Sequence, residues 1–341
     1  MEQKKIGVLL IQLGTPDSPK KKDVRRYLAE FLMDPRVIDL PYLNRLLLVR
    51  GIIVPFRTSK SSKVYQLLWK YGNGVSPLLT HSLNTTALLQ DRFKNEEIII
   101  ELAMRYQNPS MEKVLERMKK ANYDEIVILP LFPQYASATS GSAIEKALKI
   151  IQKWWVVPEI KVCSHFFHNQ GYIDSIVEQA KQFDLNSFDK IMFSYHGLPV
   201  SHVDKAHLSG KCNQEQCSEG LTTDNQFCYV AHSFETTRLL ASKLNLSKER
   251  YAVSFQSRLD NKWLTPYSDK LIKQWALEGA KKVLVFSPAF VADCLETIIE
   301  IGVEYQELFE KHGGELVQLV PSSNEHARFI DCLEEMIRTE M

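Results

Sequence analysis

Short apolar runs alternate with amphipathic stretches along the chain, and this alternation limits the possible folds more than any other feature. Runs with the length and composition of buried strands occur at 6–13, 98–103, 126–131, 160–163, 191–195, 251–257, 283–287 and 316–320. Between them, apolar residues recur three and four positions apart at 110–121, 170–182, 234–244, 265–278 and 294–311, which is typical of helices. The pattern predicts an α/β fold with parallel strands and crossover helices.

Length and charge narrow the classes of protein further. The 341 residues suit two domains, and the 45% of apolar residues is enough for buried cores. Because 42 basic and 41 acidic residues leave a net charge of +1, we expect a small partner and no nucleic acid. The apolar run at 46–54 contains Arg50 and is too short to span a bilayer, so we expect a cytoplasmic chain with reduced cysteines. No glycine-rich phosphate-binding motif occurs.

A weak internal repeat indicates two halves of the same topology. The first strand runs into Leu13-Gly14-Thr15-Pro16, and a strand near the middle runs into His196-Gly197-Leu198-Pro199. A later strand in each half is followed by a threonine at the same distance, Thr139 in the first half and Thr297 in the second. Chance use of Gly and Pro at strand ends is the alternative. We favour a duplication, with one half at 1–155 plus 315–341 and the other at 156–314.

His196 and Glu296 are candidate reactive residues in the second half. His196 comes directly after one predicted strand and the segment Asp293–Glu296 follows another, and the crevice of a parallel sheet lies outside the carboxyl ends of its strands. An imidazole there can take up a proton or bind a metal ion, although a histidine that merely ends a strand is the alternative. One histidine and one carboxylate form an incomplete metal site, which suits an ion that is a substrate.

Glu296 belongs to a row of four acidic residues in the sequence. Asp293, Glu296, Glu300 and Glu304 are spaced by three, four and four positions, which predicts one stripe on a helix. Such a ladder could attract a divalent cation or carry protons away. The alternative is a solvated outer face.

Basic and apolar groups could bind a flat, anionic ligand. Candidate cations are Arg57, Lys60, Arg105 beside Tyr106, and Arg258, each of which could instead be a surface charge. The region 31–56 is strongly apolar. Buried, it would be a helix pair in the core; exposed, it would be a lip that contacts a membrane or an apolar ligand.

Three cysteines cluster in and directly after the polar segment 209–227, namely Cys212, Cys217 and Cys228, with Cys163 further upstream. A [2Fe-2S] cluster needs four thiolates, so we favour loop cysteines without a metal. The absence of a Cys-x-x-Cys pair makes structural zinc the least favoured interpretation.

Six ordered motifs resemble the ferrochelatase family over nearly the whole chain. They are Leu13–Pro16, Phe31–Ile38, Pro130–Tyr135, Ser194–Pro199, Ser254–Arg258 with Trp263–Tyr267, and Asp293–Thr297. The resemblance implies two Rossmann-like halves, each a parallel sheet flanked by helices, with the active-site cleft between them and 31–56 as its lip. It also implies insertion of Fe2+ into protoporphyrin IX to form protohaem, no required cofactor, and peripheral contact with the inner face of a membrane.

The resemblance also implies roles for individual residues. His196 matches the catalytic and metal-binding histidine, Glu296 matches the carboxylate that faces it, and Asp293, Glu300 and Glu304 match the acidic ladder. Porphyrin contacts are implied for Arg57, Lys60, Arg105, Tyr106, Ser257 and Trp263. His196 would take up pyrrole protons or deliver iron, and the residues leave these two roles open.

Three departures from the family pattern stand out. Leu13 replaces a tyrosine or methionine of some members, and Ser218 and Ser233 stand where further cysteines of the insert are expected. The sequence ends without the cysteine-bearing tail of the animal enzymes, so their cluster cannot be assumed, and a [2Fe-2S] cluster on Cys212, Cys217 and Cys228 is the less favoured alternative. Two alternatives stay open: a chelatase for coproporphyrin or another tetrapyrrole, and a porphyrin or haem carrier without turnover.

Overall fold

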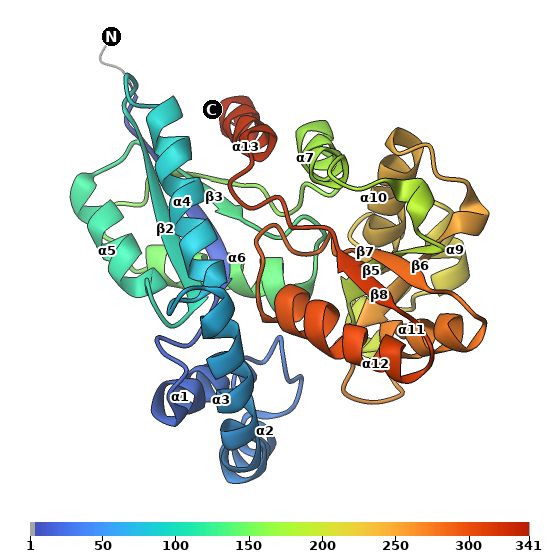
Figure 1. Cartoon of the computed structure of the whole chain (residues 1–341). Coiled ribbons are helices and arrows are strands. Elements are labelled where there is room, and N and C mark those ends of the chain that lie inside the picture. The colour runs from blue at the N-terminus through green and yellow to red at the C-terminus, as the bar shows by residue number, and fades with distance from the viewer. Residues whose placement is uncertain (1–3, 341) are drawn as a thin grey trace. The chain divides into compact units, whose positions relative to one another are not determined.

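The computed structural model describes residues 4–340, which form two compact units with a parallel sheet in each (Figure 1). The first unit comprises the residues up to Phe132, Ser137–His165, and the C-terminal residues from Ile330. The second comprises Pro133–Ala136 and Phe166–Phe329.

The sheet of the first unit has the order β2-β1-β3-β4. Its strands are β1 (Ile6–Gly14), β2 (Ile98–Tyr106), β3 (Glu125–Pro130) and β4 (Glu159–Val162), all parallel. The central strand β1 is almost wholly buried, because helices cover both faces of a parallel sheet. This explains why its sequence is continuously apolar rather than alternating.

Helices of the first unit pack on this sheet and extend beyond it. Helices α5 (Met111–Ala121) and α6 (Ser142–Ile151) bury their apolar sides against Leu9, Ile11 and Ile128, while α4 (Pro77–Arg92) contacts β1 and β2. Ser110 caps α5 by accepting a hydrogen bond from Lys113 N, and Asn122 ends it in the left-handed conformation. A short π-helix, η2 (Ser137–Gly141), leads into α6.

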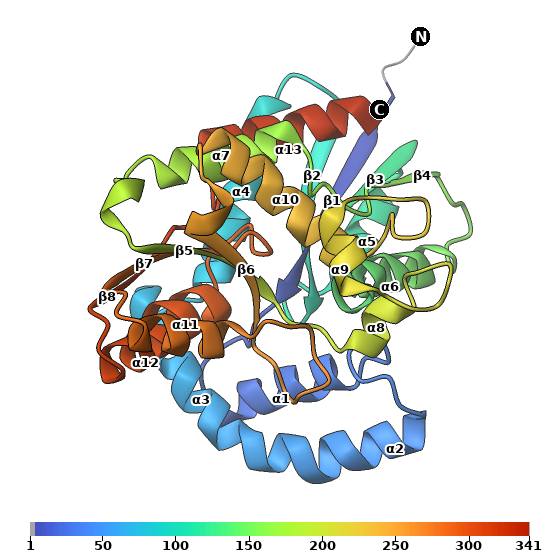
Figure 2. The same ribbon diagram turned by 90° about the vertical axis from the view of Figure 1, so that its right-hand side faces the viewer.

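A helical region between β1 and β2 forms the rest of this unit. It comprises α1 (Lys21–Leu32), α2 (Tyr42–Leu46), the π-helix η1 (Leu47–Ile53) and α3 (Val54–Tyr71). Figure 2 shows α2, η1 and α3 as one continuous, curved helical run. The small apolar cluster of Leu32, Val49 and Val54 joins this run to α1.

The second unit repeats the strand order as β6-β5-β7-β8. Its parallel strands are β5 (Lys190–His196), β6 (Tyr251–Gln256), β7 (Lys282–Phe286) and β8 (Leu316–Leu319). One face packs on α11 (Ser268–Leu277), the π-helix η5 (Glu296–Tyr305) and α12 (Gln306–Lys311). On the other side, α7 (Gln170–Ala180) packs with α10 (Tyr229–Lys243), whose Thr237 hydroxyl lies 2.8 Å from that of Tyr195 in β5.

Shorter elements complete the chain. They are the 3-10 turns η3 (Leu185–Ser187) and η4 (Lys248–Arg250), the helices α8 (Val200–Asp204) and α9 (Gln214–Glu219), and the C-terminal α13 (Ala327–Glu340). Among residues 4–340, no helix combines the length and the apolar character that crossing a membrane requires.

The predicted fold class is confirmed. Each apolar run expected to be a strand forms one, and the two sheets have the same strand order, as the internal repeat indicated. Equivalent bonds follow the second strand of each half, from Met104 N to Pro109 O and from Phe255 N to Pro266 O.

The boundaries between the units differ from the predicted ones. Strand β4 pairs with β3 and so belongs to the first unit, which continues to His165 rather than ending at 155. Strand β8 pairs with β7, so the segment from 315 to Phe329 belongs to the second unit. The sequence pattern could not show to which unit β4 and β8 belong. Both are short strands at a sheet edge, and their unit is decided by the strand with which each one pairs.

Candidate active site

His196 is the last residue of β5, at the carboxyl edge of the second sheet. Its side chain is half-buried, and its Nδ1 lies 2.7 Å from the carbonyl oxygen of Gly197. Since a carbonyl only accepts hydrogen bonds, Nδ1 carries the proton and Nε2 carries the lone pair. The structure therefore presents Nε2 as the nitrogen that can accept a proton or a metal ion.

Aromatic rings flank this imidazole. The ring centroids of Trp263 and Phe290 lie 6.4 Å and 6.3 Å from that of His196. Trp263 is half-buried and forms a β-bridge with Pro199, next to a hydrogen bond from Leu264 N to Leu198 O. The loop after β5 and the loop after β6 thus fix an apolar ring beside His196, and the contact of Trp263 with a porphyrin stays a prediction.

Glu296 opens η5 and is linked to the same sheet edge through Gln256. In the strand pairing, Gln256 is the partner of His196. Its side-chain Nε2 donates to the carbonyl oxygen of Glu296 at 3.1 Å. The buried amide of Gln256 therefore ties the start of η5 to the strand beside His196, a role that the sequence analysis did not assign. The catalytic and metal-binding roles of Glu296 stay predictions.

Glu300 lies in a dense hydrogen-bond network. Its carboxylate accepts hydrogen bonds from Ser257 N at 2.8 Å, Gln256 Nε2 at 3.2 Å and the Tyr305 hydroxyl at 3.1 Å, and also from the Ser257 hydroxyl. Burial, followed by the charge of Glu300, raises the pKa of Tyr305 well above its usual range, which keeps this hydroxyl a donor. Ser257, a predicted propionate contact, is here engaged with Glu300.

The predicted acidic stripe is only partly a helical ladder. Asp293 precedes η5 and accepts hydrogen bonds from Asn324 Nδ2 at 2.7 Å, Thr297 Oγ1 at 3.0 Å and Ser322 N at 3.3 Å. These bonds join the loop after β7 to the loop after β8, so Asp293 links the two loops at this edge of the sheet. Glu304 lies on η5 and is exposed. That these carboxylates conduct ions or protons stays a prediction.

Arg105 and Tyr106, two of the implied porphyrin contacts, form a polar network with Asp34 and Ser142 in the first unit. The Tyr106 hydroxyl donates to Asp34 at 2.9 Å, and Arg105 forms an ion pair with the same carboxylate. Arg105 Nε also donates to Ser142 Oγ at 2.6 Å. Tyr106 is 0% exposed, and burial raises its pKa well above the usual range. The pair therefore braces the end of β2, and direct contact of Tyr106 with a ligand would require it to leave this network.

Arg57 and Lys60 lie exposed on α3, next to an exposed apolar surface. We call this surface the apolar lip; its large exposed side chains are Tyr42, Leu43, Leu47, Ile52 and Phe56. Leu47 is 70% and Phe56 80% exposed. Of the two interpretations of 31–56, the exposed one is therefore correct for these side chains. That Arg57 and Lys60 bind propionates stays a prediction.

Comparison with known proteins decides the family. A model of the ferrochelatase family matches residues 5–341. The chain belongs to the ferrochelatase family. A protein named ferrochelatase from Coxiella burnetii, strain Dugway 5J108-111, is 40% identical over 99% of this chain and 94% of its own length. Ferrochelatase from Legionella pneumophila, strain Lens, is 41% identical over 98% of this chain and 99% of its own.

Solved structures agree on the fold. SirB from Bacillus subtilis with Fe3+ matches with a TM-score of 0.55 at 11% identity, over 98% of this chain and 95% of that one. The sirohydrochlorin chelatase SirB from Bacillus subtilis subspecies spizizenii, in complex with cobalt, matches with a TM-score of 0.50, also at 11% identity and the same coverage. At this identity the likeness supports the two-sheet fold alone.

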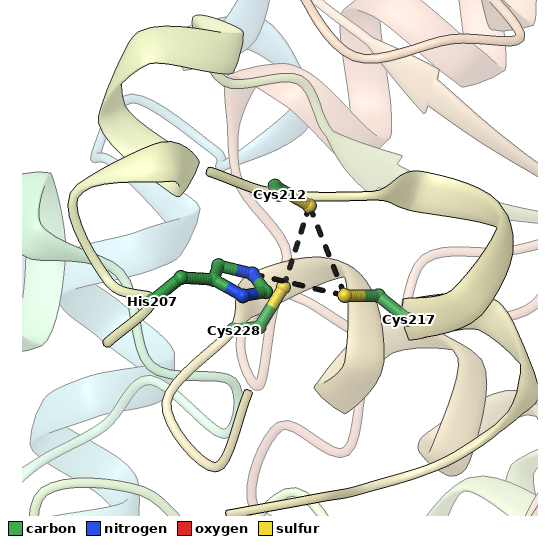
Figure 3. A group of neighbouring side chains, drawn as sticks. All are labelled: His207, Cys212, Cys217 and Cys228. Carbon is green, nitrogen blue, oxygen red and sulfur yellow. Dashed lines mark hydrogen bonds between the residues drawn. The ribbon is translucent and has the colours of Figure 1, made fainter. Parts of the chain in front are cut away.

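In this member of the ferrochelatase family, the three cysteines of the segment 209–228 are not solvent-exposed loop residues as expected. Cys212, Cys217 and Cys228 are buried, and their sulfur atoms meet beside Nε2 of His207 (Figure 3). Ser218 and Ser233 lie elsewhere in hydrogen bonds to the backbone of Glu215 and Tyr229. His207 was not among the residues predicted for this cluster, although it precedes Cys212 by five positions, the same interval that separates Cys212 from Cys217.

Proposed function

We propose that the protein inserts Fe2+ into protoporphyrin IX and so forms protohaem. The observation that carries this proposal is the position of His196, whose Nε2 lone pair stands at the carboxyl edge of the β5–β6 pair in a chain of the ferrochelatase family. The metal chelatase activity follows from the family. The choice of protoporphyrin and the roles of individual residues are the finer part of the proposal.

His196 supplies the base that the reaction needs. Insertion of Fe2+ forms four iron–nitrogen interactions and releases two pyrrole protons, and the lone electron pairs of the deprotonated nitrogens pass to the metal. An imidazole is suited to accept these protons near neutral pH. Glu296, at the start of η5, would take a proton onward or complete the coordination of the incoming ion.

The porphyrin ring must also be distorted, because a planar macrocycle directs its nitrogen lone pairs inward. A protein that binds the bent ring more tightly than the flat one lowers the barrier to insertion. Trp263 beside His196 supplies a rigid surface for this purpose. The apolar lip offers further surface, and Arg57 and Lys60 on α3 would attract the propionates.

We also propose peripheral contact with the inner face of a membrane through the apolar lip. Several large apolar side chains on one helical run are exposed there. Such a surface suits a substrate that is itself poorly soluble in water.

The test is anaerobic Fe2+ insertion into protoporphyrin IX and into coproporphyrin III, followed by the loss of porphyrin fluorescence. We expect turnover with protoporphyrin, and a reduction of about 10²–10⁴-fold in His196→Ala because a general base is lost. Porphyrin binding, measured by quenching of protein fluorescence, should persist in the variant. Glu296→Gln should also reduce insertion.

A matched control is His312→Ala. His312 is also half-buried, and its Nδ1 bonds a backbone carbonyl, that of Leu308, at 2.8 Å. It lies after α12, so its loss should leave insertion unchanged. A preference for coproporphyrin III would identify that porphyrin as the substrate instead of protoporphyrin IX. Tight binding without insertion of either ring would favour the carrier, and equal insertion by His196→Ala and the parent would refute the role of His196.

A further inference from the structure

A second group of metal-binding side chains lies in the second unit, outside the site described above. His207, Cys212, Cys217 and Cys228 are all buried, and their ligand atoms lie within 4.8 Å of one another. In Figure 3 the four side chains point toward a common centre. We propose that they bind a single Zn2+ ion that holds the segment 205–228 in its fold.

The distances match one tetrahedral ion. The Cys212 sulfur lies 3.9 Å from that of Cys217 and 3.9 Å from that of Cys228, and Cys217 Sγ lies 3.7 Å from His207 Nε2. With Zn–S bonds of about 2.3 Å and Zn–N bonds of about 2.0 Å, tetrahedral geometry places two sulfurs about 3.8 Å apart and a sulfur and nitrogen about 3.5 Å apart. Three thiolates and one imidazole are a common donor set of structural zinc.

The same distances argue against a two-iron cluster. A [2Fe-2S] cluster divides four protein ligands between two irons, so ligands on different irons stand further apart than ligands on one. Here Cys212 is equally close to Cys217 and Cys228, and all four donors share one small volume. The four donor atoms are therefore arranged around a single metal ion rather than a two-iron cluster.

The imidazole is oriented as a metal ligand requires. His207 Nδ1 donates to the Asp224 carboxylate at 3.0 Å, which leaves the Nε2 lone pair facing the sulfurs. Asp224 is itself held by Ser209 N at 2.7 Å and Ser209 Oγ at 3.0 Å. A carboxylate behind a ligating histidine fixes its tautomer and strengthens the ligand. This contact is independent of the cysteines and points to the same ion.

The surrounding segment gives a physical reason for a metal. Between α8 and α10 its regular structure is α9, a helix of six residues, and the large apolar side chains Leu208 and Leu221 are exposed. Such a segment buries little apolar surface to offset its loss of chain entropy. An ion bound by residues from four points along it would supply that stability.

The metal site is also adjacent to the framework of His196. Cys228 is the N-cap residue of α10, and the hydroxyl of Thr237 on this helix lies 2.8 Å from that of Tyr195, the residue before His196 in β5. The ion therefore fixes the start of the helix that supports this strand. We expect loss of the ion to lower turnover as well, a consequence that rests on the proposed function.

The experiment measures metal in the purified protein by elemental analysis, together with acid-labile sulfide. The wild-type protein should hold about one zinc per chain and no sulfide. Cys217→Ser and His207→Ala should lose it. Cys163→Ser, a change to a cysteine outside the cluster, should retain it, and so should His196→Ala, which removes the nitrogen proposed to meet substrate iron.

Wild-type protein supplies an independent readout in case a ligand variant misfolds. After the zinc is exchanged for Co2+, a tetrahedral thiolate site gives intense visible absorption and a sulfur-to-cobalt charge-transfer band. Asp224→Ala should keep the fold but weaken Zn2+ binding by about 10–100-fold in competition with a chelator.

Three results would overturn the proposal. They are wild-type protein without bound metal or cobalt spectrum, iron with an equal amount of labile sulfide, and zinc that persists undiminished in both Cys217→Ser and His207→Ala. None of these measurements uses porphyrin, so their failure is distinguishable from failure of the proposed function.

Discussion

The glycine at the end of the first strand of each half shows how one residue shapes the site. A Cβ atom on Gly14 would lie 2.0 Å from the carbonyl oxygen of Tyr106 in β2, and one on Gly197 would lie 2.7 Å from that of Gln256 in β6. In both halves the chain leaves its strand close against the neighbouring strand. The recurring Gly-x-Pro pattern therefore reflects a close backbone approach that no other residue permits.

Gly197→Ala should disturb this point directly. The added methyl group would meet the Gln256 carbonyl, a backbone atom that accepts from Gly197 N, and would also lie 3.3 Å from Cε3 of Trp263. We expect a loss of about 1–3 kcal/mol in the free energy of unfolding, measured with urea, and reduced iron insertion. The control is Gly220→Ala, where the backbone is extended and no atom lies within 4 Å. Equal stability of the two variants would contradict this account.

Individual site residues differed in how far the sequence could predict them. His196 and Trp263 follow strands, so strand ends and the family motifs located them. Gln256 and His207 were missed, because their roles depend on contacts made across the fold, with Glu296 and with three cysteines. Tyr106 was placed correctly at a strand end, but its burial against Asp34 depends on packing with α1 and α6.

At the level of elements, the strands were predicted better than the helix details. Parallel strands are buried on both faces, so their apolar runs are distinct in the sequence. The acidic spacing assumed an α-helix from Asp293 onward, whereas the structure has a π-helix that begins at Glu296. Asp293 stays outside because Asn324, Thr297 and Ser322 hold its carboxylate in the loop. Asn324 and Ser322 are distant in the sequence, and the position of Thr297 in the motif did not reveal its contact with Asp293.

Helix α13 should make a pH-dependent contribution to the first unit. A hydrogen bond from Arg338 holds the pKa of Glu96 below its usual range. Because the folded pKa is lowered, the pair stabilises the fold above the unfolded value of about 4.3, and this contribution disappears as the pH falls through the lower folded value. Glu96→Gln should cost less than about 1 kcal/mol at neutral pH, since the pair is near the surface.

The measurement is urea unfolding of the parent and Glu96→Gln at neutral and at acidic pH. The difference between the two proteins should shrink at acidic pH and with added salt. Glu307→Gln removes one negative charge from an exposed position on α12 and serves as the control. A difference that grows on acidification would show that the sign is wrong.

At the scale of the whole molecule, charge and apolar exposure predict how the proposed contact with a membrane should depend on salt and lipid composition. The net charge of +1 gives little general attraction to anionic lipid, whereas the apolar lip exposes Leu47 and Phe56 almost fully. We expect binding to vesicles that depends weakly on salt and on the fraction of anionic lipid. The double substitution Leu47→Ser and Phe56→Ser should weaken it at least about tenfold, because each side chain contributes about 1.5–3 kcal/mol when buried.

Vesicle sedimentation checks this expectation. Leu277→Ser, a change at a leucine that is 66% exposed at the end of α11, is the control and should bind like the parent. Vesicle binding that falls steeply with added salt and is unchanged by the double substitution would show that the contact depends on charge instead of the apolar lip.

The organisation into two halves was visible in the sequence, but its boundaries were not. The repeat at Gly14 and Gly197 marks equivalent strands, and the sheets confirm it. The segments that change units are edge strands and connections, such as Pro133–Ala136, where Phe166 N donates to Pro133 O and Gln134 donates to Thr236. Their membership is set by long-range pairing, which leaves no local pattern.

The shared strand order has a consequence for the history of the chain. Copying one ancestral half within a gene would have produced two strand ends of the same construction, and today one carries His196 where its counterpart carries Leu13. Both glycines are required by a close backbone approach, whereas the residue before each glycine differs between the halves. The two halves therefore share a strand framework, while the proposed reactive imidazole belongs to the second half and the helical region α1–α3 to the first.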